Sequence, residues 1–146
     1  MATYLVKQSF NFYELHDEMV LCVAFSPAGD EVVASGHSGH VKIYNLTQRT
    51  VRLKLPAHKE PVNVCRFSPS GKLVCSGSDD ASVRLYSAES GDFRGSINLH
   101  NLRVLDIRPV PSTNKVREYM FKMQCVSPHS HANLIFGTKV RFALVA

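Results

Sequence analysis

The sequence lacks several features that would assign it to a class at once. It contains no tryptophan in 146 residues, and none of its four cysteines lies in a CxxC or Cys/His spacing. No apolar run approaches the roughly 18 residues of a membrane helix, and the start MATYLVKQSF lacks the long apolar core of a secretory signal. We therefore expect an intracellular protein, in the cytoplasm or nucleus, that has reduced cysteines and no contact with a membrane.

Motifs for catalysis and for metal binding are also missing. The sequence has no GxSxG, no Walker glycine loop, no HExxH and no dinucleotide fingerprint. Two histidine pairs, His37/His40 and His129/His131, have no cysteine or carboxylate ligands at a useful spacing. We expect a protein that is not an enzyme and that binds no cofactor and no metal.

Positive charge is concentrated in the last third of the chain. Residues 1–91 carry nine Lys/Arg and nine Asp/Glu, whereas residues 92–146 carry eight against three, which accounts for the net charge of +5. A basic segment is one feature of nucleic-acid-binding proteins, although here the charges are dispersed and not interleaved with aromatic residues. An alternative function is therefore that of a basic RNA- or ribonucleoprotein-associated factor that uses this C-terminal segment.

An internal repeat is the most informative feature of the chain. The segment HDEMVLCVAFSPAGDEVVASGHSGHVKIYNL, from His16, recurs as HKEPVNVCRFSPSGKLVCSGSDDASVRLYSA, from His58. The matched pairs are His16/His58, Val20/Val62, Phe25/Phe67, Ser26/Ser68, Pro27/Pro69, Gly29/Gly71, Val41/Val83 and Tyr44/Tyr86. Between them Val33/Val74, Ser35/Ser76 and Gly36/Gly77 match after a slip of one residue. Self-similarity at such a period is typical of repeat architectures.

Each copy of the repeat predicts four short strands. An apolar segment leads into Ser-Pro-x-Gly, which sets a turn because proline fixes φ and glycine accepts positive φ. A β-branched run, a polar turn and an alternating strand (VKIYNL or VRLYSA) follow, and a fourth strand is expected over 50–55 and about 93–99. Four antiparallel strands in about 42 residues make one propeller blade.

These motifs resemble the WD40 repeat family over residues 16–88, through His, FSPxG, SG and (D)xxV(R/K)(L/I)Y. The resemblance implies an all-β fold, a partial WD40-type β-propeller with two clear four-stranded antiparallel blades and a degenerate third. It also implies a hydrogen-bonded tetrad of His, Ser/Thr, Asp and Trp in each blade. The tetrad positions are His16, Ser35 and Tyr44 in the first copy and His58, Ser76, Asp80 and Tyr86 in the second. Because Ser38 stands where Asp is usual, we expect the first blade to be the weaker one.

The period of the repeat also predicts where each repeat begins and ends. We expect residues 1–15 to be the last strand of a preceding blade or an N-terminal closing strand, 16–57 and 58–99 to be two WD repeats, and 100–146 to be a degenerate third repeat or a divergent basic tail. Within that last segment, either LRVLDIRPV opens a third blade or residues 101–117 are an insertion before a blade that begins at Tyr119. We favour the insertion, because the length from Ser127-Pro128 to VRF fits a repeat.

The number of repeats has a consequence for assembly. About 3.5 units fit into 146 residues, whereas closed propellers have about four to eight blades. An open stack of blades leaves strand edges and apolar faces exposed. We therefore expect a truncated isoform, a fragment of a longer propeller, or a partial propeller that associates with itself or is completed by another chain.

Partner binding is the function that this family resemblance implies. Propeller loops that carry the tetrad His and Asp commonly dock other proteins, because a rigid sheet framework holds variable loop residues in place. By position, the candidates for partner binding are Glu18, Met19, His37, Glu60, Pro61, Ser78 and Asp79. We expect a non-enzymatic scaffold or adaptor that mediates protein–protein interactions in a multiprotein complex.

Overall fold

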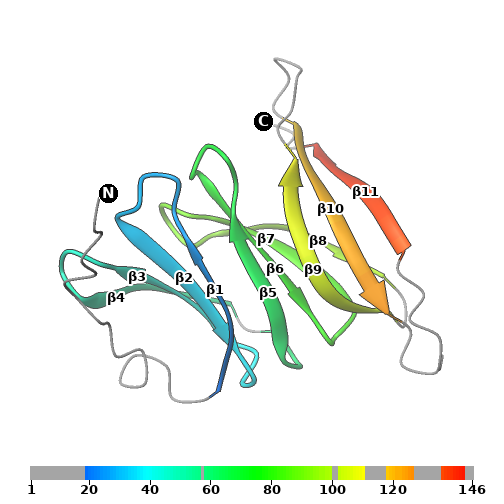
Figure 1. The fold of residues 1–146 in the computed structure, drawn as a ribbon, viewed down its shortest axis with the longest axis horizontal. Coiled ribbons are helices and arrows are strands. Elements are labelled where there is room, and N and C mark those ends of the chain that lie inside the picture. The colour runs from blue at the N-terminus through cyan, green and yellow to red at the C-terminus, as the bar shows by residue number, and fades with distance from the viewer. Residues whose placement is uncertain (1–18, 57, 100–101, 111–117, 127–135, 144–146) are drawn as a thin grey trace, which may run out of the picture.

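The computed structural model describes residues 19–56, 58–99, 102–110, 118–126 and 136–143, and the strands in these ranges form three separate antiparallel sheets (Figure 1). Blade 1 consists of β1 (Val20–Phe25), β2 (Glu31–Gly36), β3 (Val41–Asn45) and β4 (Thr50–Leu55). Blade 2 consists of β5 (Val62–Phe67), β6 (Leu73–Ser78), β7 (Ser82–Ser87) and β8 (Phe93–Asn98). Blade 3 consists of β9 (Arg103–Val110), β10 (Glu118–Val126) and β11 (Phe136–Ala143). In each blade, strands that follow one another along the chain are paired.

The Ser-Pro-x-Gly turns close the first hairpin of blades 1 and 2 in the same way. Gly29 and Gly71 have φ values of 79° and 72°, a conformation that glycine adopts without steric cost. The serine that opens each turn accepts a hydrogen bond at its Oγ from the first residue of the next strand, at 3.1 Å in both blades. The repeated motif therefore specifies a repeated turn, as the sequence predicts.

Alternation along the strands gives blade 2 two apolar faces, and each is covered by a neighbouring blade. One face joins Val33, Val41, Ile43 and Leu55 of blade 1 to Val62, Cys65, Phe67, Val74, Tyr86 and Ala88 of blade 2. The other face joins Val64, Leu73, Cys75, Val83 and Leu85 of blade 2 to Val104 and Ile107 of β9. Successive residues of a strand point to opposite faces, so Val74 packs toward blade 1 while Cys75 packs toward blade 3. The two cores of the described structure thus lie between the blades.

A polar contact adds to the packing between blades 1 and 2. The Arg52 guanidinium on β4 forms an ion pair with Glu31 on β2, in which Nη2 donates to Oε2 at 2.8 Å. The same guanidinium donates to the carbonyl oxygens of Ala88 (2.7 Å) and Glu89 (3.0 Å), in the turn that follows β7. Because planar guanidinium groups hold several acceptors at once, Arg52 fixes the outer part of blade 1 against blade 2.

The interpretation of residues 101–117 as an insertion is wrong. Residues 103–110 form β9, which pairs with β10 and packs against β5, as β5 packs against β1 (Figure 1). Gly77 on β6 allows this approach, since a Cβ there would lie 2.4 Å from Cγ1 of Val104. The segment LRVLDIRPV therefore opens the third blade, at the spacing of the preceding repeats. The length from Ser127-Pro128 to VRF fits a repeat, but a length carries no information on the apolar contact of β9 with blade 2.

Several of the sequence predictions concern residues outside the described ranges. Residues 1–15, expected to form a strand of a preceding blade, lie outside the described residues, as do His16, Glu18 and the segment between β10 and β11. In the part of the chain that the structure describes, no helix is long and apolar enough to span a membrane.

Phe67 and its repeat equivalent Phe25 offer a test of packing between blades. Phe67 is 5% exposed in the contact with blade 1, whereas Phe25 on β1 is 66% exposed. We expect Phe67→Ala to lower the free energy of unfolding by about 3–5 kcal/mol, because it removes a buried aromatic ring and leaves a cavity. Phe25→Ala, the matched control, should change it by less than about 0.5 kcal/mol. Urea unfolding of the purified chain measures both, and equal losses would contradict the packing described here.

Candidate functional site

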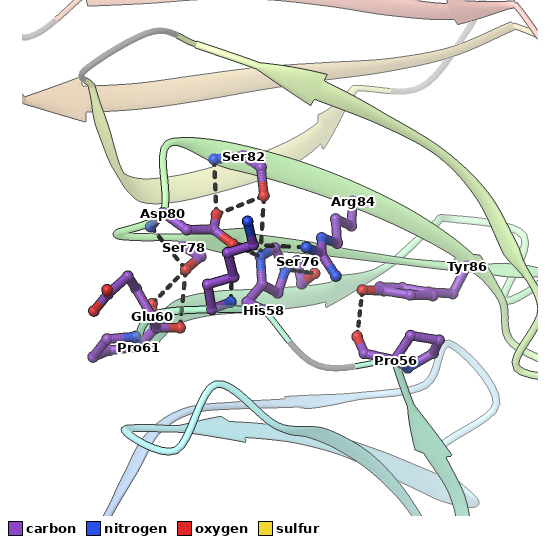
Figure 2. A network of polar contacts seen from close by, with 11 residues as sticks. Pro56, His58, Glu60, Pro61, Ser76, Ser78, Asp80, Ser82, Arg84 and Tyr86 are labelled. Atoms are coloured by element: carbon purple, nitrogen blue, oxygen red, sulfur yellow. Dashed lines mark hydrogen bonds and ion pairs between the residues drawn. The ribbon is translucent and has the colours of Figure 1, made fainter.

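A network of polar side chains lies at the end of blade 2 where β6 turns into β7 (Figure 2). The buried imidazole of His58 is its centre: Nδ1 lies 3.0 Å from Oδ2 of Asp80 and Nε2 lies 2.7 Å from Oγ of Ser76. A carboxylate can only accept, so Nδ1 carries the proton and Nε2 accepts a hydrogen bond from the Ser76 hydroxyl. The structure brings these three residues together as the family resemblance implies.

Asp80 is held in place by the tight turn that it occupies. Its Oδ1 accepts hydrogen bonds from the Ser82 amide (2.9 Å) and the Ser82 hydroxyl (2.5 Å), and its Oδ2 accepts one from the Lys59 amide (3.2 Å). Ala81, next in the turn, has a φ of 61°, which is unusual for a residue with a Cβ. Arg84 lies 3.8 Å from the same carboxylate. One side chain thus joins the β6–β7 turn to the segment that precedes β5.

Burial and hydrogen bonding set the charge states in this network. Burial lowers the pKa of His58 and outweighs the opposing effect of Asp80, so the imidazole is neutral near pH 7. Burial alone would raise the pKa of Asp80. Hydrogen bonds from Ser82 and from His58 outweigh burial and lower that pKa. A neutral imidazole beside a charged carboxylate that accepts several hydrogen bonds satisfies each buried polar group.

Tyr86 extends the network across the contact between blades. Its hydroxyl donates to the carbonyl oxygen of Pro56 at 2.9 Å, just after β4 of blade 1 (Figure 2). The ring is fully buried among the residues shared by the two blades, and burial raises the pKa of the phenol. Tyrosine at this position therefore supplies both an apolar ring and a hydrogen bond to the neighbouring blade.

Blade 1 does not repeat this network. The strand pairing of the two blades aligns at one constant offset, the same as that from His16 to His58. Ala34 pairs with Lys42 as Ser76 pairs with Arg84. Ala34, not Ser35, is therefore the equivalent of Ser76, and the assignment of Ser35 to a tetrad is wrong. Aligning Ser35 with Ser76 requires a shift of one residue relative to the rest of the repeat. Such a shift would turn every side chain of the strand to the opposite face.

The remaining side chains of blade 1 are consistent with this difference. The Ser35 hydroxyl is buried beside the Cys65 thiol, in the contact with blade 2. Ser38, at the position equivalent to Asp80, contacts Nδ1 of His40 at 2.9 Å. Tyr44 is buried at the position equivalent to Tyr86. Blade 1 thus keeps the aromatic residue of the network and lacks both its serine and its aspartate.

Most of the residues expected to bind partners lie at this same end of the two blades, which we call the loop face. Met19, His37 and Glu60 are exposed, and Pro61 is partly exposed. Backbone hydrogen bonds join their loops: the His37 amide donates to the Met19 carbonyl, and the His58 amide donates to the Gly39 carbonyl, each at 3.0 Å. A Cβ at Gly39 would lie 2.6 Å from the His58 carbonyl oxygen, so glycine is required where the loops meet. The loop face is continuous from blade 1 to blade 2.

Ser78 and Asp79 have structural roles that the sequence did not reveal. Ser78 is fully buried, and its hydroxyl donates to the carbonyl oxygens of Glu60 (3.1 Å) and Pro61 (2.8 Å). Its side chain is therefore not part of a partner-binding surface. Asp79 accepts a hydrogen bond from Asn63 at 2.6 Å and forms an ion pair with Arg103 of blade 3 at 3.6 Å. Both residues therefore hold the loops in position through contacts beneath the surface.

The arginines whose side chains are described after residue 92 also have partners. Arg94 pairs with Asp92, Arg103 with Asp79 and Arg108 with Asp106, at 4.0, 3.6 and 2.9 Å. These ion pairs reduce the positive charge that this segment would present to a phosphate. Among the described residues, no group of three or more His, Cys, Asp or Glu side chains is placed to hold a metal ion.

These sheets and this network define a stack of propeller blades, and the comparisons with known proteins identify the family. The WD40 family model (WD domain, G-beta repeat) matches residues 7–45 and 49–87, more than half of the chain, and the two matches are offset as the two blades are. The chain belongs to the WD40 repeat family, as the sequence predicts. No curated protein matches it significantly.

A solved structure shows the same fold over most of the chain. The β-propeller domain of Cps50 (Swd1) from Myceliophteria thermophila is 18% identical with a TM-score of 0.65. The match covers 87% of this chain and 39% of that one. The chain therefore spans well under half of that propeller domain, and a likeness at this identity shows the fold alone.

Asp80 and its repeat equivalent Ser38 provide a matched pair of variants. Asp80→Ala removes the acceptor of the His58 ring and of both Ser82 groups. We expect a loss of about 1–3 kcal/mol in the free energy of unfolding, because buried donors lose their partner. Ser38→Ala should cost less than about 0.5 kcal/mol, since its contact with His40 is exposed. Chemical denaturation compares the two variants, and an unchanged midpoint for Asp80→Ala would contradict the network.

Lowering the pH should reduce the stability of the folded chain through protonation of His58. Its folded-state pKa lies below the ordinary histidine value of 6.5, so between these two values the unfolded chain binds more protons than the folded one. Its contribution to stability is present above pH 6.5 and is lost as pH falls through the folded pKa. We expect the thermal midpoint to fall from pH 7.5 to pH 5.5, and to fall less in His58→Gln. The exposed His37→Gln is the control, and an identical pH dependence in all three proteins would refute this role of His58.

Proposed function

We propose that the chain is a non-enzymatic WD-repeat scaffold that binds other proteins through its loop face and contributes blades to a multiprotein complex. Proteins of the WD40 family are commonly interaction scaffolds and are typically non-catalytic. The observation that carries the proposal is the convergence of the exposed Met19, His37 and Glu60 on one continuous surface. Residues 1–18, and with them Glu18, lie outside the described part of the chain.

The chemistry of the loop face favours a protein partner. Met19 supplies an exposed apolar side chain, while His37 and Glu60 supply polar groups around it. An apolar contact surrounded by polar residues is a common arrangement at protein interfaces. The loops beneath are fixed by Ser78, Asp79 and Gly39, so the backbone that carries the exposed side chains moves little when a partner binds. A preorganised surface loses less conformational freedom on binding.

Two triple variants test whether partners bind at the loop face. The first carries Met19→Ala, His37→Ala and Glu60→Ala. The second, a matched control at the opposite ends of the strands, carries Thr47→Ala, Gln48→Ala and Glu89→Ala, all at exposed positions. Because each set removes three exposed side chains and one carboxylate, the two differ mainly in location. Both should have the circular dichroism spectrum of the unaltered chain.

The measurement is quantitative affinity capture from a lysate with the chain as bait. We expect the loop-face variant to lose at least one reproducible partner by tenfold or more, with the control variant unaffected. Reciprocal capture by the partner, at moderate and high salt, separates protein binding from adhesion through RNA, which weakens steeply with salt. Identical partner sets for both variants would refute the loop face as the binding surface.

A further inference from the structure

The contact between β1 and β5 brings two cysteines and an arginine together. Nη1 of Arg66 donates to the Cys22 sulfur at 2.8 Å and to the Cys65 carbonyl oxygen at 2.9 Å. The Cys22 sulfur lies 3.6 Å from the Cys65 carbonyl, and the Cys65 sulfur lies 3.8 Å from the Cys22 carbonyl. Cys22 is on blade 1, and both of its partners are on blade 2. The three residues thus form one cluster across the contact between the two blades.

The two sulfur atoms have different surroundings. Cys65 is fully buried, and its thiol also approaches the carbonyl oxygen of Val33 at 3.7 Å. Cys22 is partly exposed, on the strand at the edge of blade 1. A thiol that is partly exposed beside a guanidinium has the features of a reactive cysteine, whereas a fully buried thiol is inert.

We propose that Cys22 is a site of covalent modification, at which its thiolate, held by the Arg66 guanidinium, attacks soft electrophiles such as peroxides. With hydrogen peroxide as the oxidant, the sulfur attacks one oxygen and the O–O bond breaks. The sulfur is oxidised to a sulfenic acid, and the second oxygen leaves as hydroxide. The new S–O bond forms where blades 1 and 2 meet, so the modification acts on the contact between repeats.

The charges around the cluster support a thiolate at Cys22. Hydrogen bonding from Cys65 and the positive charge of Arg66 outweigh burial and lower the pKa of Cys22 from 9.0 to about 5. Asp106 on β9 lies 3.7 Å from Arg66 and also binds Arg108, so it withdraws only part of the charge of Arg66. In contrast, burial raises the pKa of Cys65 and of Cys75.

Alkylation with iodoacetamide tests the proposal, with each cysteine followed by peptide mass mapping. At pH 6 we expect native Cys22 to react about tenfold faster than the same cysteine in the chain unfolded in guanidinium chloride. Nearly complete ionisation accounts for the gain, and the lower nucleophilicity of a low-pKa thiolate limits it. The native rate should change little from pH 6.5 to 8.5, whereas the rate in the unfolded chain should rise steadily.

Variants distinguish activation by Arg66 from exposure alone. Arg66→Met should slow alkylation of Cys22 at pH 6 and move the midpoint of its pH profile upward, while Arg66→Lys, which keeps the charge, should retain most of the rate. Asp106→Asn removes the competing carboxylate and should move the midpoint of the pH profile downward; an unmoved midpoint would contradict the role of Arg66 even where Arg66→Met fails to fold. Cys75→Ser is the control and should leave Cys22 unchanged.

The proposal is overturned if native Cys22 follows the pH profile of the unfolded chain, or if it is protected at every pH. It is equally overturned if Arg66→Met, folded by circular dichroism, reacts as the unaltered chain does. Treatment with hydrogen peroxide should add one oxygen atom per chain at Cys22, as a sulfenic acid that dimedone traps. The same treatment should give no dimedone adduct at this position in Cys22→Ser. Loss of partner binding at the loop face would leave this outcome unaffected, since the two sites share no residue.

Discussion

A four-stranded sheet of this kind has two apolar faces, and in this chain each blade covers a face of the next. Blade 2 shows the arrangement completely: Val74 and Tyr86 pack toward blade 1, and Cys75 and Leu85 pack toward blade 3. A single sheet of this size leaves too much apolar surface in water to be stable alone. The turns, the His58 network and the loop face all depend on this packing, because it fixes where the ends of the strands lie. On β1, in contrast, the side chains of Phe25 and Val23 are exposed.

Several polar groups act at the contacts between blades, and others join a blade to the segment that leads into it. Asp80 joins the β6–β7 turn to the segment before β5, Tyr86 reaches Pro56 of blade 1, and Asp79 reaches Arg103 of blade 3. Burying such groups is costly unless each has a partner. Apolar packing brings the blades together, and these paired polar contacts then select one relative position. The same principle places Arg66 between Cys22, Cys65 and Asp106, where a structural arginine also creates a reactive thiol.

Blade 1 has the fold of blade 2 without the serine and the aspartate of the polar network. Ala34 and Ser38 replace the serine and aspartate of blade 2, yet the strands pair in the same register with the same turns. The blade still buries Val33, Val41 and Ile43 against its neighbour. Packing and turn geometry therefore suffice for the shape of a blade, and in blade 2 the network adds paired polar contacts to that shape.

The sequence by itself determined the period of the repeat, the turns and the strands of two blades, because these depend on local chemistry: proline and glycine at the Ser-Pro-x-Gly turns, and alternation within each strand. It also indicated His58, Ser76 and Asp80, since the matched motif carries them. It misassigned Ser35 because an alignment of identical residues does not show which face of the strand a side chain occupies. Only the pairing of the strands determines that face. It misplaced the start of blade 3 because β9 is recognised by its packing against β5 and by the room at Gly77. Tertiary structure alone decided that Ser78 is buried, that Asp79 holds a neighbouring blade and that Arg66 reaches Cys22, because each contact joins residues whose separation in the chain carries no signal of their proximity.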